Sequence, residues 1–242
     1  MTINRRRPTA FAWSAPETPP APAREPLTRS QIVSVAIRLI DAEGLEAFSM
    51  RRLGQELGAG ATSLYWHVKS KEQLIDLVLD ELIGEVLTEV PRVDGWRAQL
   101  AEIAQALRRV LVRHRNVAPL LGERPTIGPN SLDAAEYTLR TMVEAGFTER
   151  SAWTATGALV NYAAGFALLE SRGPRGGSDT PEGQAMRQAI TDYFAALPAD
   201  RYPNMIRVMR LQVSEEEQFE YGLERLLDGI ELARSREAAR AD

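Results

Sequence analysis

The chain of 242 residues contains no cysteine and only two histidines, His67 and His114. Without cysteine it can form no disulfide and has no thiol nucleophile, and so few histidines exclude most zinc sites and most histidine-based catalytic schemes. The sequence also lacks a nucleophile and base pair, a glycine-rich phosphate loop and the spacing of metal ligands. We therefore expect no enzyme activity, no metal site and no cofactor.

Long uncharged runs are also scarce, and the longest candidate is residues 151–169. Its nineteen residues are enough to raise the question of a membrane span. However, Thr154, Thr156, Asn161 and the flanking charges fit a buried interface better than lipid. No signal peptide precedes the first predicted helix, and an apolar content of 44% is enough for a full core. We expect a soluble cytoplasmic protein with no membrane partner.

Charge is distributed unevenly along the chain. Residues 1–71 carry ten Lys and Arg against six Asp and Glu, a net charge of +4, whereas residues 72–242 carry nineteen against twenty-seven, a net charge of −8. A basic N-terminal part is expected where a protein neutralises the phosphates of nucleic acid. We therefore look for DNA contacts in the first third of the chain.

Residues 1–26 hold six prolines and the run Arg5-Arg6-Arg7, with almost no apolar periodicity. This composition is typical of a disordered arm. Two interpretations of the arginine run stay open. It is either a solvated tail or an arm that reaches the backbone or minor groove of DNA.

Residues 27–73 have the pattern of three short helices joined by turns. Thr28 and Gln31 form a capping box, and Ser49 caps the second helix. The third helix follows a glycine-bearing turn and covers residues 61–67. This is the pattern of a helix-turn-helix unit, whose last helix enters the major groove. Its apolar inner face is formed by Leu53, Leu57 and Leu64.

The remainder of the chain is predicted to be helical, so the fold class is all-α. A capping box at Ser70 and Gln73 begins a fourth helix almost at once. Because this helix continues into the body, a movement of the body can displace the three-helix unit through it. Apolar spacings of three and four predict further helices at 94–114 and 130–145, another opens at Thr180-Pro181, and the last runs from Ser214 to about residue 238.

A wide apolar stripe marks the last helix and needs a partner. Either it packs against a second subunit or it packs within its own subunit. In the run 151–169, Gly157, Ala164 and Gly165 would let a partner helix approach closely. We predict a dimer interface formed by Gly157, Ala164, Phe219, Leu223, Leu226, Leu227 and Ile230.

Several segments carry a resemblance to a known family: LYWHVKSK at 64–71, HRNVAPLLGERPT at 114–126, EAGF at 144–147 and FEYGLERLLDGIE at 219–231. They resemble the tetracycline repressor class of the TetR/AcrR family of transcriptional regulators over nearly the whole chain. The resemblance implies a DNA-binding domain at 27–73 and a helical regulatory and dimerisation domain at 74–239. It also implies a homodimer, built on 149–171 and the last helix, that binds a palindromic operator in double-stranded DNA.

The resemblance places the DNA contacts residue by residue. Arg51 lies where the tetracycline repressor has a base-reading arginine, which can bridge guanine O6 and N7. Ala61-Thr62-Ser63 replaces Gln-Pro-Thr, so the operator should differ. The positions that match mainly contact phosphate in the family, although Trp66 could instead brace the third helix against the fourth. The predicted DNA contacts are Arg51, Ala61, Thr62, Ser63, Tyr65, Trp66, His67 and Lys71.

The ligand site departs from the family. The magnesium-chelating histidine of the tetracycline repressor matches Leu120, which cannot bind a metal, and its drug contacts fall at Leu87, Ile103 and about Thr138. We infer a more apolar pocket without metal. The predicted pocket residues are Leu87, Ile103, Leu107, Leu120, Thr138, Asn161 and Phe166. Further candidates are Leu79, Leu82 and Leu139 for the wall, and Glu123 and Arg124 beside Asn161 as polar anchors.

Together these features predict a homodimeric repressor that a small, largely apolar effector releases from its operator. An effector that binds the spread state better would shift the fourth helix and the spacing of the two DNA-binding units. The alternative is a regulator with no small-molecule effector, either constitutive or controlled by a protein partner. A compact body with no cavity would favour that alternative.

Overall fold

A computed structural model describes residues 27–171, 180–209, 211 and 213–241, without the side chains of Ala61, Thr62, Arg240 and Ala241. Within these ranges the chain forms ten α-helices and one short 3-10 helix, and it contains no β-strand. The predicted all-α fold is confirmed. The proposed N-terminal arm, residues 1–26, lies outside the described residues.

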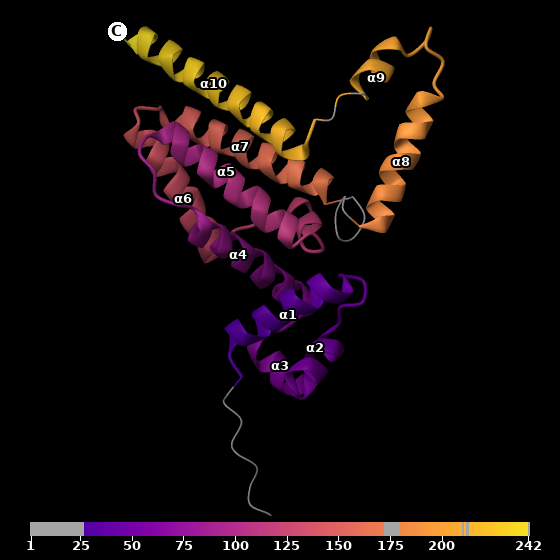
Figure 1. The fold of residues 1–242 in the computed structure, drawn as a ribbon. Coiled ribbons are helices and arrows are strands. Elements are labelled where there is room, and N and C mark those ends of the chain that lie inside the picture. The colour runs from indigo at the N-terminus through magenta and orange to yellow at the C-terminus, as the bar shows by residue number, and fades with distance from the viewer. Residues whose placement is uncertain (1–26, 172–179, 210, 212, 242) are drawn as a thin grey trace, which may run out of the picture.

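Helices α1 (Arg29–Glu43), α2 (Met50–Leu57) and α3 (Ala61–His67) pack together at one end of the molecule, and we call them the reading head (Figure 1). The capping box of Thr28 and Gln31 forms as predicted, and the Ser49 hydroxyl accepts a hydrogen bond from the Arg52 amide. The turn before α3 contains a glycine in the left-handed conformation, as its sequence requires. Leu53 and Leu64 are fully buried, so they form the predicted inner face.

Helix α4 (Lys71–Glu89) leaves the reading head and runs into the body (Figure 1). The Ser70 hydroxyl caps it by accepting from the Gln73 amide, whereas the Gln73 side chain accepts from the amide of Lys69, one residue before the position that a capping box would use. The Lys71 ammonium donates to the carbonyl of Phe48 at 2.8 Å. These contacts fasten the start of α4 to the loop before α2.

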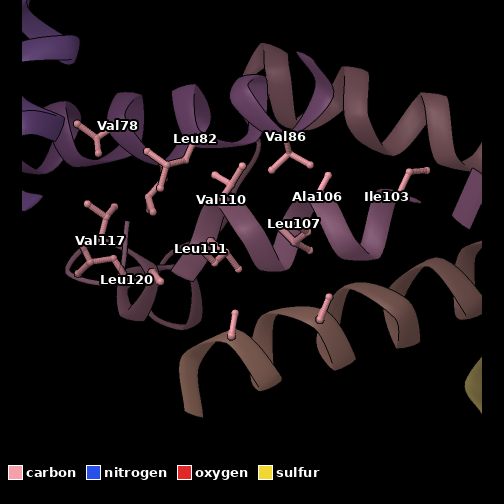
Figure 2. Close-up of a cluster of buried hydrophobic side chains, with 14 of the residues drawn as sticks. Val78, Leu82, Val86, Ile103, Ala106, Leu107, Val110, Leu111, Val117 and Leu120 are labelled. Atoms are coloured by element: carbon pink, nitrogen blue, oxygen red, sulfur yellow. The ribbon is translucent and has the colours of Figure 1, made fainter. Parts of the chain in front are cut away.

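The body consists of α5 (Trp96–Arg113), the 3-10 helix η1 (Ala118–Gly122), α6 (Pro129–Glu144), α7 (Glu149–Glu170) and α10 (Glu215–Ala241). Figure 2 shows its core at the crossing of α4 with α5 and η1, where Leu82 and Val86 of α4 face Ala106 and Val110 of α5. Apolar spacings of three and four on each helix produce this contact. No described helix is long and apolar enough to cross a membrane.

Helix α10 lies along α7 and α5, and Arg108 of α5 fixes its start. The Arg108 guanidinium donates to Glu170 of α7 at 2.8 Å and to Glu216 of α10 at 2.6 Å, and it lies 4.7 Å from the ring centre of Phe219. Between α7 and α10 the chain forms α8 (Pro181–Ala195) and α9 (Pro203–Val208), which project away from the body (Figure 1).

The apolar stripe of α10 packs within its own subunit. Phe219 is fully buried, and its carbonyl accepts a hydrogen bond from the Tyr162 hydroxyl of α7 at 2.7 Å. A neighbouring helix of the same chain covers much of this stripe, and a contact of the stripe with a second subunit stays a prediction. The buried members are Phe219, Leu223, Leu227 and Ile230, while Leu226 is partly buried.

A buried histidine joins the reading head to the body. His114, at the end of α5, places Nδ1 2.7 Å from Oδ2 of Asp41 in α1 and Nε2 2.9 Å from Oε2 of Glu85 in α4. The other carboxylate oxygen of Asp41 is buried and has no hydrogen-bond partner among the residues that the structure describes. Arg113 also pairs with Glu85, and Asn116 donates to the carbonyls of two α1 residues. Both ring nitrogens must carry hydrogen to donate to both carboxylates, so this geometry requires the imidazolium ion.

The hydrogen bond that His114 donates to Asp41 raises the pKa of His114 above its ordinary value, and burial opposes this rise. Because the folded-state pKa exceeds the unfolded value of about 6.5, the stabilisation is fully present below that pH and is lost as pH rises through the folded-state pKa.

We predict that His114→Gln lowers the free energy of unfolding by about 1.5–3 kcal/mol at pH 6, because hydrogen bonds to charged groups contribute amounts of this order. The loss should shrink toward pH 9, because the stabilisation disappears as pH rises through the folded-state pKa of His114. Urea unfolding at both pH values measures it, with His67→Gln as the control. A penalty that is equal at pH 6 and pH 9 would contradict the doubly donating imidazolium.

Candidate DNA-binding surface and effector cavity

The outer face of α3 carries large side chains that none of the described residues covers. Trp66 is 86% exposed and Tyr65 is 49% exposed, Ser63 is exposed, and His67 is partly buried. Trp66 is therefore not a brace between α3 and α4, which corrects that alternative. An exposed indole beside a phenol and a hydroxyl can stack on or donate hydrogen bonds to a ligand outside the protein.

Two adjacent arginines at the start of α2 have different surroundings. Arg52 forms ion pairs with Glu43 of α1 at 2.6 Å and with Glu56 at 2.9 Å, so it belongs to the reading head's own structure. Arg51 is exposed and forms no ion pair within the part of the chain that the structure describes. The guanidinium of Arg51 is thus available for a contact outside the protein, as the sequence predicted.

The remaining predicted DNA contacts are Ala61, Thr62 and Lys71. The side chains of Ala61 and Thr62 lie outside the described part of the structure. The Lys71 ammonium also sits 5.5 Å from the ring centre of Phe48, so it is engaged inside the reading head in addition to any contact with phosphate. Their roles on DNA stay predictions.

A cavity of about 970 Å³ lies among α4, α5, η1, α6 and α7. Its wall is mostly aliphatic, with a single indole from α7. The described residues that line it are Ile83, Val86, Ile103, Leu107, Ala118, Leu121, Gly122, Thr126, Ser131, Ala134, Ala135, Thr138, Trp153, Thr154, Thr156, Gly157, Ala158, Val160, Asn161, Ala164, Gly165 and Leu168.

The polar groups of this wall are few and uncharged. The hydroxyls of Thr138 and Thr154 donate to the carbonyls one helical turn before them, each at 2.8 Å, and so are left mainly as acceptors. The Asn161 amide makes no hydrogen bond to any described residue and can both donate and accept. None of the described residues on the wall carries a charge, and no cluster of candidate metal ligands occurs among the residues described. This chemistry fits a neutral, largely apolar molecule.

Four of the seven predicted pocket residues line the cavity: Ile103, Leu107, Thr138 and Asn161. The other three do not, and each has a different neighbour. Leu87 faces a separate hollow of about 340 Å³ that contains charged side chains. Leu120 is buried in the core, and Phe166 packs edge-on against the ring of Phe219 at 5.2 Å.

The further pocket candidates do not line the cavity either. Leu79 and Leu82 are buried in the core, and Leu139 is partly buried against it. Arg124 pairs with Asp76 of α4 at 2.6 Å rather than facing the cavity, and Glu123 is not on the wall. Gly157 and Ala164, which we expected at a dimer interface, line the cavity in the single chain, and their place in a dimer stays a prediction.

Sequence reasoning missed the contribution of α6. Ser131, Ala134, Ala135 and Thr138 share one face of this helix, and all four line the cavity. Their spacing of three and four was a usable signal, but small residues gave it little apolar weight. Matching single positions to the tetracycline repressor found Thr138 alone.

Two family profiles match the chain. Residues 32–78 match the family described as bacterial regulatory proteins, tetR family, and residues 90–234 match the tetracyclin repressor-like C-terminal domain. The first match covers most of the reading head and the first part of α4. The second covers all the helices from α5 to α9 and most of α10.

Individual proteins are similar over most of their length. An HTH-type transcriptional regulator of Saccharopolyspora erythraea is 37% identical over 73% of this chain and 72% of its own. The tetracycline repressor protein class D of Escherichia coli is 32% identical over 85% of this chain and 90% of its own. The structure of ActR from Streptomyces coelicolor in complex with actinorhodin has a TM-score of 0.74 and 33% identity, and covers 87% of this chain and 99% of ActR. The chain belongs to the TetR family of bacterial transcriptional regulators.

Proposed function

We propose that this protein is a homodimeric transcriptional repressor that leaves a palindromic operator when a neutral small molecule occupies the cavity. The observation that carries the proposal is the position of the uncharged cavity against α4. Ile83 and Val86 of α4 belong to its wall, and the same helix begins at the reading head. A ligand that prefers one position of α4 therefore shifts the reading heads. The cavity also argues against a regulator without an effector.

The reading head supplies the DNA contacts in this proposal. Arg51 reads a base edge, since a guanidinium can donate twice to guanine in the major groove. The exposed Tyr65 and Trp66 of α3 contact the sugar-phosphate backbone and fix the register of the helix. The relatives named as repressors, among them the tetracycline repressor class D, support this reading.

A second copy of the chain completes the proposal. Large apolar side chains also stay exposed on α7 and α10, where Leu169 is 63% and Tyr221 is 67% exposed. The projecting helix α8 exposes Met186, Ile190 and Tyr193 as well. Exposed apolar surface of this extent marks an interaction site. A two-fold dimer through these faces presents two reading heads to the two halves of a palindrome.

The effector class follows from the wall of the cavity. Tetracycline bound through magnesium needs metal ligands, and the wall offers hydroxyls and one amide but no imidazole or carboxylate. A neutral ligand with a broad apolar surface loses little on desolvation and can hydrogen-bond to Asn161. Actinorhodin, the ligand in one ActR structure, is the natural first probe.

We predict that Arg51→Ala weakens binding to the operator by roughly 5-fold to 100-fold, because a bidentate contact with guanine contributes about 1–3 kcal/mol. The substitution should also relax the preference for one base pair in each half-site. Fluorescence anisotropy at fixed salt, on an operator selected from random duplex DNA, measures both effects. Arg150→Ala, which removes the same charge from α7, is the control and should bind as wild type. Unchanged affinity and base preference in Arg51→Ala would refute the base-reading role.

We also predict that actinorhodin raises the melting temperature saturably, since a ligand of the folded state stabilises it by mass action. Tetracycline should give no shift, with or without magnesium. Ala135→Phe, which fills the cavity, should abolish the actinorhodin shift, whereas Leu132→Phe on the exposed face of the same helix should retain it. A magnesium-dependent tetracycline shift would show that the inferred ligand class is wrong. The same holds if neither actinorhodin nor a library of neutral compounds has any effect.

A further inference from the structure

Asp80 is a buried carboxylate that α4 contributes to the start of a different helix. Its Oδ1 accepts hydrogen bonds from the amide and the hydroxyl of Ser131, both at 2.9 Å, and its Oδ2 accepts from the amide of Asn130 at 3.2 Å. In return, the Asn130 side-chain amide donates to the carbonyl of Asp80 at 3.1 Å. Four hydrogen bonds therefore join the middle of α4 to the first turn of α6.

These bonds replace the cap that α6 lacks. The first amides of a helix have no partner within the helix, and the helix dipole favours negative charge there. The N-cap residue is Gly128, which has no side chain to accept from them. A Cβ atom at Gly128 would lie 2.2 Å from Cγ of Asp80, so this position leaves just enough room for the carboxylate. Helix α6 thus depends on a residue of α4 for its N-terminal cap.

The same contact lies at the edge of the cavity. Ser131 belongs to the cavity wall, and so does Ile83, one turn after Asp80 on α4. A Cβ atom at Gly84 would lie 2.8 Å from the Asn130 amide nitrogen, so the two helices touch closely here. The α6 wall cannot shift relative to α4 without breaking the hydrogen bonds of Asp80.

The other end of α4 is equally fixed. Leu74, Ile75 and Val78 are buried where α4 meets the reading head, and Lys71 holds the carbonyl of Phe48 at the start of the helix. A displacement of α6 that α4 follows therefore reaches the reading head through a continuous helix.

We propose that Asp80 is the positioning residue that couples occupancy of the cavity to DNA release, by making α4 follow the start of α6. The inference rests on the proposed function, and it assigns Asp80 no contact with the effector or with DNA. It requires that loss of the Asp80 hydrogen bonds weaken the coupling, and not merely the stability of the fold.

A double-mutant cycle on operator affinity tests the coupling without a known effector. Ala135→Phe places a ring in the cavity as a substitute for a ligand, and the second substitution is Asp80→Ala. With Asp80 present, we expect Ala135→Phe to weaken operator binding by on the order of tenfold, within the usual range of allosteric coupling. In the Asp80→Ala background the same ring should weaken it by less than about twofold. Glu81→Gln, an exposed carboxylate next in sequence, is the control and should keep the full effect.

Variants that remove only some of the Asp80 hydrogen bonds should weaken the coupling only in part. Asp80→Asn keeps one acceptor oxygen and Ser131→Ala removes a single hydrogen bond, so both should give effects between those of wild type and Asp80→Ala. These variants carry the test if Asp80→Ala fails to fold, which its melting temperature shows. A purely structural role would lower the melting temperature and leave the effect of Ala135→Phe unchanged.

The outcomes distinguish failure of the role of Asp80 from failure of the proposed function. Equal loss of affinity on adding Ala135→Phe in all backgrounds would overturn the role of Asp80 and leave the proposed function in place. No loss from Ala135→Phe even with Asp80 present, while Leu132→Phe is equally silent, would mean that the cavity does not control DNA binding. The proposed function would then fail, and the role of Asp80 with it.

Discussion

Helix α4 is buried in two cores at once, and the relation between the reading head and the body depends on this burial. It packs on α1 of the reading head and on α5 and α6 of the body. Separating either core would expose several aliphatic side chains, each worth about 1.5–3 kcal/mol when fully buried. Because both ends of this continuous helix are packed, a displacement of its body end would also displace the reading head, as the proposed function requires.

The charged side chains connect the helices around α4 and leave the described cavity wall without charge. His114 between Asp41 and Glu85 joins the reading head to α4 and α5. At the far side of the body, Arg108 between Glu170 and Glu216 fixes the points at which the chain leaves and re-enters the body around α8 and α9. The Asp80 carboxylate accepts hydrogen bonds from the first amides of α6. These ion pairs thus connect the helices of the protein, and none of them involves a residue of the described cavity wall.

Local rules predicted much of this structure. The capping residues Thr28, Ser49 and Ser70 act at the helix starts that the sequence indicated, because a cap depends on neighbours within four residues. The exposed Arg51 and Trp66 could be expected from the helix-turn-helix pattern.

Long-range placement could not be derived in the same way. The stripe on α10 signals burial but not which chain supplies the partner, so the packing of Phe219 against α7 of its own chain could not be derived from it. Leu120 and Phe166 have the right chemistry for a pocket, yet apolar side chains at similar positions point into the core. Asp80 gave no signal at all, since its partners lie fifty residues further along the chain.

The central claim is that one equilibrium governs both the cavity and the DNA surface, and reciprocity tests it most directly. Two dissociation constants should be measured for the compound that gives the largest thermal shift, one for the free protein and one for the protein saturated with operator. The account predicts that operator weakens binding of the compound by the same factor by which the compound weakens binding of the operator. Equal affinity of the compound for the free and the operator-bound protein would contradict it.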